Sequence, residues 1–163
     1  MVGMPGSGKT TVGRRLAQGM DMAFLDTDAE IERLEGKTVS EIFADQGEVY
    51  FRQREAEALQ RACVENGVVV ATGGGVVLNP GNVRLARESG LVVYLHRGIE
   101  NIAAASDFAG RPLLAEDPGR LGTLFRERAG LYEAACHKAV DNDGDLNETV
   151  RRIMALLGES TTE

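Results

Sequence analysis

Residues 3–10 of this 163-residue chain read Gly-Met-Pro-Gly-Ser-Gly-Lys-Thr and match the pattern G-x-x-x-x-G-K-[ST] at every fixed position. In this pattern the glycines let the chain turn so that successive backbone N–H groups face one concavity, which binds phosphate oxygens at the start of a helix. An apolar helical pattern follows the motif directly, as that arrangement requires. The sequence therefore predicts a nucleotide phosphate site rather than a glycine turn that happens to precede a lysine. Lys9 is expected to reach the β- and γ-phosphates, and the Thr10 hydroxyl to ligate Mg²⁺.

The rest of the chain alternates strand and helix patterns. Continuous apolar runs at 68–72 and 91–95 predict strands buried on both faces, and shorter strands are expected at 23–26 and 139–141. Repeated β-α units predict an α/β fold of the P-loop type, a parallel sheet with helices on both faces and ligands at the carboxyl ends of the strands. Only two residues precede the loop, where a buried strand is expected. Either the first strand is almost absent or the chain has lost its beginning.

Composition limits the class of protein. The length predicts one domain, spanning 1–163, and the net charge of −7 argues against nucleic acid or an anionic membrane as the main partner. Cys63 and Cys136 are far apart and lack the spacing of a zinc site or a disulfide framework. No apolar run approaches the length of a membrane span, and no leader pattern precedes the loop. We therefore expect a cytoplasmic protein, and a monomer because no large exposed apolar stripe is evident.

Asp26 and Asp28 end the predicted strand at 23–26. In an extended chain residues i and i+2 point to the same side, roughly 7 Å apart. Beside the phosphate loop, one carboxylate could hold Mg²⁺ through its waters and the other could accept a proton from an attacking hydroxyl. The alternative is a polar strand exit in which Asp28 caps the next helix.

Two further segments are candidates for binding an anionic acceptor. Arg52 and Glu55 are three residues apart in a predicted helix, so the carboxylate can hold the guanidinium in one pose for bidentate binding, although such pairs are also common on solvated faces. The glycines at 73–75 directly follow a buried strand, which indicates close approach of a ligand to the backbone or else a simple loop.

Arginines also occur in and after a polar stretch at about 106–119. If this stretch is a lid, Arg111 could close over the phosphates and stabilise the charge that develops during transfer. Arg128, on the following predicted helix, could face the same cleft, or either side chain could simply be solvated.

Taken together, five ordered elements resemble the shikimate kinases across essentially the whole chain. They are GMPGSGKT at 3–10, DTD at 26–28, FRQRE at 51–55, GGG at 73–75, and RPLL at 111–114 followed by RAGLY at 128–132. The resemblance implies transfer of the ATP γ-phosphate to the 3-hydroxyl of shikimate, on the route to aromatic amino acids. It implies one Mg²⁺ ion, ATP and shikimate as ligands, a lid at about 106–119, and a substrate-binding helical segment at about 28–66.

The resemblance also implies roles for individual residues. Lys9, Asp28 and Arg111 would act in catalysis, with Asp28 as the base, Lys9 bridging to the transferred group and Arg111 in the lid. Thr10 and Asp26 would serve the metal. The nucleotide would be bound by Gly6, Ser7, Gly8, Lys9, Thr10, Thr11 and Arg111. Shikimate would be bound by Asp28, Arg52, Gly73, Gly74, Gly75 and Arg128.

The sequence departs from the family pattern near the expected adenine site. Residues 103–105 are alanines where a basic residue is usual, and the loop at 142–145 is acidic where an arginine is often found. We therefore expect a weaker grip on the base, with the phosphate contacts contributing more. Two other functions stay open: a small-molecule kinase of the same fold, such as a gluconate kinase, and a non-catalytic nucleotide-binding relic.

Overall fold

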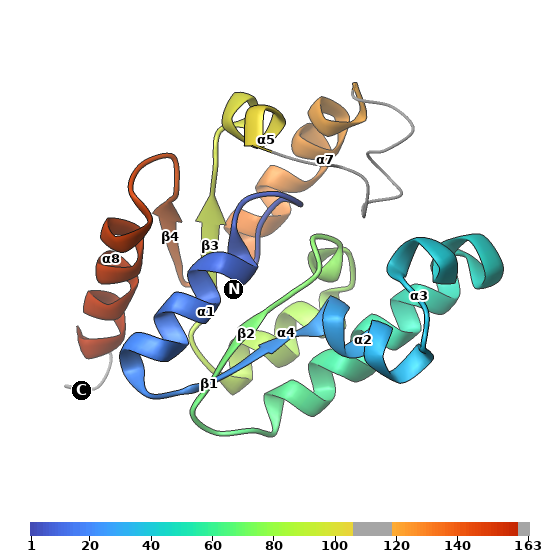
Figure 1. Ribbon diagram of the computed structural model, residues 1–163, viewed down its shortest axis with the longest axis horizontal. Coiled ribbons are helices and arrows are strands. Elements are labelled where there is room, and N and C mark those ends of the chain that lie inside the picture. Colours follow the sequence, from blue (N-terminus) through green and yellow to red (C-terminus); the bar gives the residue numbers. More distant parts are fainter. Residues whose placement is uncertain (106–118, 160–163) are drawn as a thin grey trace.

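The computed structural model describes residues 1–105 and 119–159. Figure 1 shows helices on both sides of parallel strands, as expected for an α/β fold. In chain order the elements are α1 (Lys9–Met20), β1 (Ala23–Asp26), α2 (Thr27–Glu35), α3 (Val39–Cys63), β2 (Val68–Ala71), the 3₁₀ turn η1 (Val76–Leu78), α4 (Pro80–Ser89), β3 (Val93–His96), α5 (Ile99–Ala105), α7 (Arg120–Ala135), β4 (Lys138–Asp141) and α8 (Leu146–Glu159).

Met1 and Val2 join the two halves of the sheet. β1 pairs in parallel with β2, and β3 pairs in parallel with β4. Between these pairs, Val2 N–H donates to the Val93 carbonyl and the Val2 carbonyl accepts from Leu95 N–H, both at 2.9 Å. On the other side the Met1 carbonyl accepts from Thr72 N–H at 3.2 Å. Two residues therefore occupy the central strand position that the sequence left in question, and they lead directly into the phosphate loop.

Side chains on β3 alternate between the two faces of the sheet, as a strand covered on both sides requires. Val93 and Leu95 belong to a core with α1 and α8, whereas Tyr94, and Val92 just before the strand, belong to a core with α4 and α7. The prediction of a strand covered on both faces is therefore confirmed for the run at 91–95, whereas β2 alternates half-buried and buried residues. α2 and α3 pack on each other around a smaller cluster beside the sheet.

Local signals in the sequence set most element boundaries. Thr38 and Glu41 form a capping box that starts α3, and Asn79 caps α4 with Pro80 at its first position. Gly47 interrupts α3 with φ 81°, so the segment is two helices joined at a kink. The predicted strand at 91–95 begins later, at Val93, and the preceding Val92 N–H donates to the side chain of His137 at 2.9 Å.

Within residues 1–105 and 119–159, none of the helices combines the length and the apolar character needed to cross a bilayer. The expected lid at about 106–119 falls, apart from Gly119, outside the described residues, and so does Arg111.

Candidate active site

The phosphate loop turns through glycines at three positions that need a left-handed or otherwise glycine-favoured backbone. Gly3, Gly6 and Gly8 have φ values of 150°, 85° and 94°. The Lys9 ammonium lies inside the loop and donates to the carbonyls of Gly3 (2.9 Å) and Met4 (2.8 Å). The loop is therefore already folded around its own cation at the N-terminus of α1, where an anion is favoured.

Positions around Lys9 differ in their access to a nucleotide. Thr10 and Thr11, in the first turn of α1, are exposed. Ser7, which was expected among the phosphate-binding residues, is fully buried, and its N–H donates to the Met4 carbonyl at 3.1 Å. The loop folds back on itself at this point, and the role of Ser7 in phosphate binding stays a prediction.

Thr10 and Asp26, the two residues assigned to the metal, are hydrogen-bonded. The Thr10 hydroxyl donates to Asp26 Oδ2 at 2.7 Å. Asp26 Oδ1 also caps α2 by accepting from the N–H groups of Asp28 (3.1 Å) and Ala29 (3.4 Å). The cap is therefore Asp26, not Asp28 as the alternative interpretation supposed. A hydroxyl and a carboxylate held together in this way are the oxygen ligands that Mg²⁺ prefers.

Asp28 is placed where its carboxyl group is hard to ionise. Burial, together with the neighbouring carboxylates of Glu55 and Asp26, raises its pKa from 3.8 to about 7, against the opposing charge of Lys9. Its Oδ1 atom is buried without a hydrogen-bond partner among the described residues. A carboxyl group with this pKa is suited to accept a proton near neutral pH.

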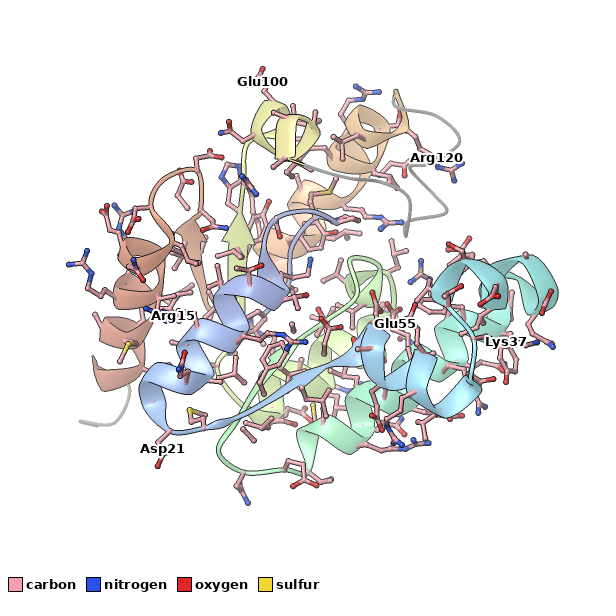
Figure 2. The ribbon with its side chains drawn as sticks, in the orientation of Figure 1. Arg15, Asp21, Lys37, Glu55, Glu100 and Arg120 are labelled. Atoms are coloured by element: carbon pink, nitrogen blue, oxygen red, sulfur yellow. The ribbon has the colours of Figure 1, made fainter. Side chains whose placement is uncertain are left out.

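Glu55 interacts electrostatically with both arginines that were expected to bind the acceptor. Arg52 Nη1 is 2.9 Å from Glu55 Oε2, as the spacing within the helix predicted, and Glu48 holds the other side of the guanidinium at 3.0 Å. Glu55 is 1% exposed, and burial raises its pKa while the positive charges of Arg52 and Arg128 lower it. Arg128 is itself only 5% exposed. In Figure 2 Glu55 lies inside the molecule, whereas labelled residues such as Lys37 project at its edge.

At each glycine of the 73–75 turn, a side chain would collide with a neighbouring residue. A Cβ on Gly73 would lie 2.6 Å from Asp28 Oδ1 and 2.6 Å from Glu55 Oε1. A Cβ on Gly75 would lie 2.1 Å from Arg52 Nη1. The turn is therefore in contact with the predicted base and with one predicted acceptor-binding arginine.

The middle glycine connects this turn to the phosphate loop and to α7. A Cβ on Gly74 would come within 2.8 Å of the Pro5 ring. The Gly74 carbonyl accepts from the Tyr132 hydroxyl at 2.6 Å. Tyr132 is one helical turn after Arg128 and interacts with its guanidinium. Residues from α2, α3, α7 and both glycine loops thus meet at one place.

This arrangement matches a known family. The family model for shikimate kinase matches residues 5–157. The chain belongs to the shikimate kinase family. It is 41% identical over 157 residues to "Shikimate kinase" of Clostridium botulinum (strain Alaska E43 / Type E3), covering 96% of this chain and 94% of the relative. It is 45% identical over 161 residues to "Shikimate kinase" of Desulforudis audaxviator (strain MP104C), covering 98% and 85%.

The comparison with solved structures indicates the same family as the comparison of sequences. A shikimate kinase from Acinetobacter baumannii in complex with shikimate superimposes with a TM-score of 0.94 at 37% identity, covering 99% of this chain and 93% of that one. A gluconokinase from Sinorhizobium meliloti reaches a TM-score of 0.59 at 21% identity, covering 97% and 90%. That second likeness shows the fold alone.

Most residues that meet at this site were predicted from the sequence. Two were not: Tyr132 and Asn142. The position of Tyr132 could have been predicted, since it lies one helical turn after Arg128 in RAGLY and therefore on the same face of the helix. The contact of Asn142 with the phosphate loop could not have been predicted, because nothing in the sequence of a polar loop indicates which side chain turns inward. Gly73 and Gly75 are buried and Gly74 is half-buried, so their part in ligand binding stays a prediction.

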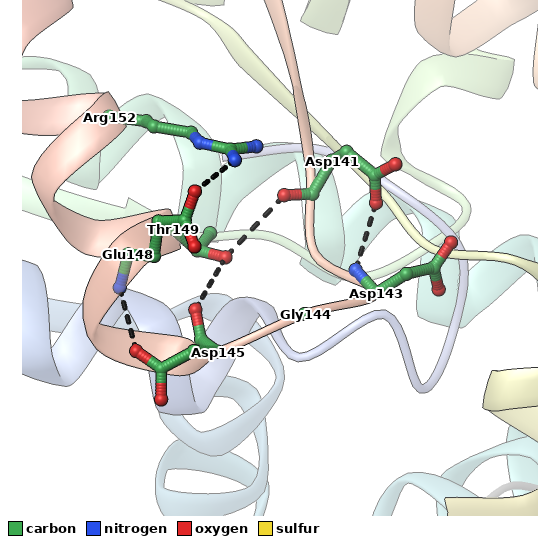
Figure 3. A pocket seen from close by; sticks show the side chains of 7 residues that line it. All are labelled: Asp141, Asp143, Gly144, Asp145, Glu148, Thr149 and Arg152. Carbon is green, nitrogen blue, oxygen red and sulfur yellow. Dashed lines mark hydrogen bonds and ion pairs between the residues drawn. The ribbon is translucent and has the colours of Figure 1, made fainter.

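The end of β4, the loop that follows it and the first turns of α8 line an acidic pocket of about 200 Å³ (Figure 3). Its only cation among the lining residues, Arg152, is paired with Glu148. The pocket is lined by Asp141, Asp143, Gly144, Asp145, Glu148, Thr149 and Arg152. This charge is consistent with the expectation that the chain grips a base weakly, which stays a prediction.

Proposed function

We propose that this chain transfers the γ-phosphoryl group of ATP to the 3-hydroxyl of shikimate, giving shikimate 3-phosphate and ADP. One observation carries the proposal: Asp28, Arg52 and Arg128 share Glu55 as a neighbour, against a glycine turn that touches the phosphate loop. A base, two guanidinium groups and a phosphate-binding loop within one site are the parts that phosphorylation of an anionic alcohol requires.

The two arginines account for an acidic acceptor. Arg52 is held on both sides by Glu48 and Glu55, so its guanidinium is presented in a fixed orientation. Arg128 is buried beside the same carboxylate. Guanidinium groups bind carboxylates bidentately, and a carboxylate on the acceptor would supply charge that this site needs. Gluconate also has a carboxylate, so the substrate has to be tested directly.

Asp28 would receive the proton of the acceptor hydroxyl. The acceptor oxygen forms a bond to the γ-phosphorus while the bond from that phosphorus to the β–γ bridging oxygen breaks, and ADP leaves with the electron pair. The pKa of Asp28, raised to about 7, lets the carboxylate take that proton near neutral pH. Lys9 and the N-terminus of α1 would neutralise the migrating charge. Arg111, outside the described residues, would add to this from the lid, as the family resemblance implies.

Mg²⁺ fits the oxygen pair formed by Thr10 and Asp26. When bound, the ion offsets negative charge on the phosphates of ATP. Thr10 would contact it directly, and Asp26 would hold its water shell while capping α2. Because Asp26 has both tasks, the position of the metal and the start of the helix that carries Asp28 are linked.

A coupled assay of ADP release tests the assignment. We expect turnover with shikimate and at least about 100-fold lower kcat/KM with gluconate, since a mismatched acceptor leaves buried polar groups unpaired. Asp28→Asn should abolish turnover while ADP still binds. Turnover with gluconate and none with shikimate would support the gluconate kinase alternative. ADP binding without turnover of either acid would support the relic.

The remaining expectations concern the state of the protein. We propose a cytoplasmic monomer that acts in aromatic amino acid biosynthesis. Sedimentation equilibrium would test the monomer, and growth of an aromatic auxotroph lacking shikimate kinase activity would test the pathway.

A further inference from the structure

We propose that Asn142 is a positioning residue for the nucleotide phosphates and acts through the phosphate loop; the proposal rests on the proposed function for the identity of the nucleotide. Asn142 follows β4 and is 9% exposed. Its side-chain amide Nδ2 donates to the Ser7 carbonyl at 2.8 Å, across 135 residues of sequence. This hydrogen bond fixes the orientation of the Ser7 carbonyl within the phosphate loop.

The geometry of the peptide between Ser7 and Gly8 explains how this bond affects phosphate binding. The Ser7 carbonyl and the Gly8 N–H belong to the same peptide, and in a trans peptide they point in opposite directions. A carbonyl held toward Asn142 therefore turns the Gly8 N–H away from Asn142. The motif binds phosphate oxygens with successive N–H groups of this turn, so Asn142 fixes the direction of one donor before the nucleotide arrives.

Gly8 is shaped to allow this contact. A Cβ at Gly8 would lie 2.6 Å from Asn142 Nδ2, so any other residue would displace the amide. Gly8 also has φ 94°, a conformation that favours glycine. The glycine that precedes Lys9 therefore serves the turn and also admits the side chain that orients it.

The loop that carries Asn142 is itself anchored. The Asn142 N–H donates to the His96 carbonyl at 2.8 Å. The next residue, Asp143, accepts through Oδ1 from Gly98 N–H (2.9 Å) and from Asn101 Nδ2 (2.7 Å). These bonds tie the loop after β4 to the loop after β3. An anchored support can hold a peptide in one orientation, whereas a free loop could not.

The same loop was expected near the adenine, so the test has to separate effects on the phosphates from effects on the base. We would compare Asn142→Leu, which has the same branching and the same number of side-chain heavy atoms but no donor, and Asn142→Ala with the wild-type chain. Binding of ADP, inorganic pyrophosphate and shikimate is measured by calorimetry with Mg²⁺. Asn147→Leu on the exposed surface of α8 is the matched control.

We expect the affinity for ADP to be about tenfold lower in both Asn142 variants, which corresponds to about 1.4 kcal/mol. The affinity for pyrophosphate, which has no base, should fall by the same factor. Shikimate affinity should change less than twofold, a separation that a general loss of structure would not give. Wild-type affinity for ADP in Asn142→Leu would overturn the proposal. A loss for ADP without one for pyrophosphate would also overturn it, because the loop would then act on the base.

If circular dichroism shows that both variants are unfolded, Asn142→Asp replaces them, since it keeps the shape and removes the donor. Measurement at 0.5 M salt screens its added charge, and unchanged pyrophosphate affinity would again contradict the proposal. None of these readouts needs phosphorylation of shikimate. A wild-type chain inactive on shikimate would therefore refute the proposed function and leave this test intact.

Discussion

Gly73 lies directly against the carboxylate of Asp28, so close that a Cβ would be 2.6 Å from Asp28 Oδ1. The same Cβ would be 2.6 Å from Glu55 Oε1. The absence of a side chain at Gly73 thus lets two carboxylates from different helices approach one point, where burial and mutual repulsion raise the pKa of Asp28.

Gly73→Ala should separate these carboxylates. We expect kcat/KM for shikimate to fall by at least about 100-fold, because a displacement near 1 Å can have that effect, and stability to fall by about 1–3 kcal/mol. Gly130→Ala, at an exposed position of α7 with open space around it, is the control and should be as stable as wild type or more so. Full activity in Gly73→Ala would show that the close approach has no part in catalysis.

Activity should depend on the ionisation of Asp28. A base is active when deprotonated, so kcat/KM for shikimate should rise with pH and level off above an apparent pKa near 7, the value that burial and the neighbouring carboxylates give Asp28. Glu55→Gln removes a charge that raises this pKa, so the rising limb should move to lower pH. Glu57→Gln, on the same helix and more exposed, should leave it in place. A profile flat from pH 5.5 to 8.5 would argue against Asp28 as the base.

The same ionisation should destabilise the fold at high pH. The native state binds the Asp28 proton more tightly than the unfolded state does, so stability is lost as pH rises from 3.8 through about 7. Asp28→Asn carries no such charge. In urea denaturation its advantage over wild type should therefore be larger at pH 8 than at pH 5, by about 2 kcal/mol. Equal differences at both pH values would contradict the raised pKa.

Tyr132→Phe should loosen the glycine turn. Loss of the 2.6 Å hydrogen bond leaves the Gly74 carbonyl without this donor, which typically costs about 1–3 kcal/mol. We expect the KM for shikimate to rise several-fold and ADP affinity to stay unchanged. Tyr50→Phe removes a hydroxyl bonded to Glu35, away from the site, and should change neither parameter. Equal effects of the two variants would mean that the loss is general.

Thr10 and Asp26 can be separated by their chemistry. Thr10→Ala should raise the Mg²⁺ concentration for half-maximal rate by about tenfold, while Thr10→Ser, which keeps the hydroxyl, should stay close to wild type. Asp26→Asn retains an oxygen that can cap α2, so it should keep most stability while losing metal affinity. If Thr10→Ser were as impaired as Thr10→Ala, the hydroxyl would not be the metal ligand.

Several parts of the fold followed from local patterns. The capping box at Thr38, the Asn79–Pro80 helix start and the apolar runs of β2 and β3 each depend on residues close together in sequence. The Arg52–Glu55 pair likewise follows from helical spacing. The start of β3 did not follow from a local pattern, because the Val92 N–H donates to the side chain of His137, 45 residues along the chain.

The phosphate loop and the α/β class could be predicted from the sequence, because backbone conformation and strand–helix periodicity are set by neighbouring residues. The family followed from the order of five short motifs. Three features depend on long-range packing: Glu55 interacts with both Arg52 and Arg128, the Oδ1 atom of Asp28 is buried near it, and Asn142 reaches Ser7. Burial and the electrostatic environment of a carboxyl group are set by residues far apart in the chain, so no local pattern specifies them. The pKa that suits Asp28 to proton transfer is a property of packing.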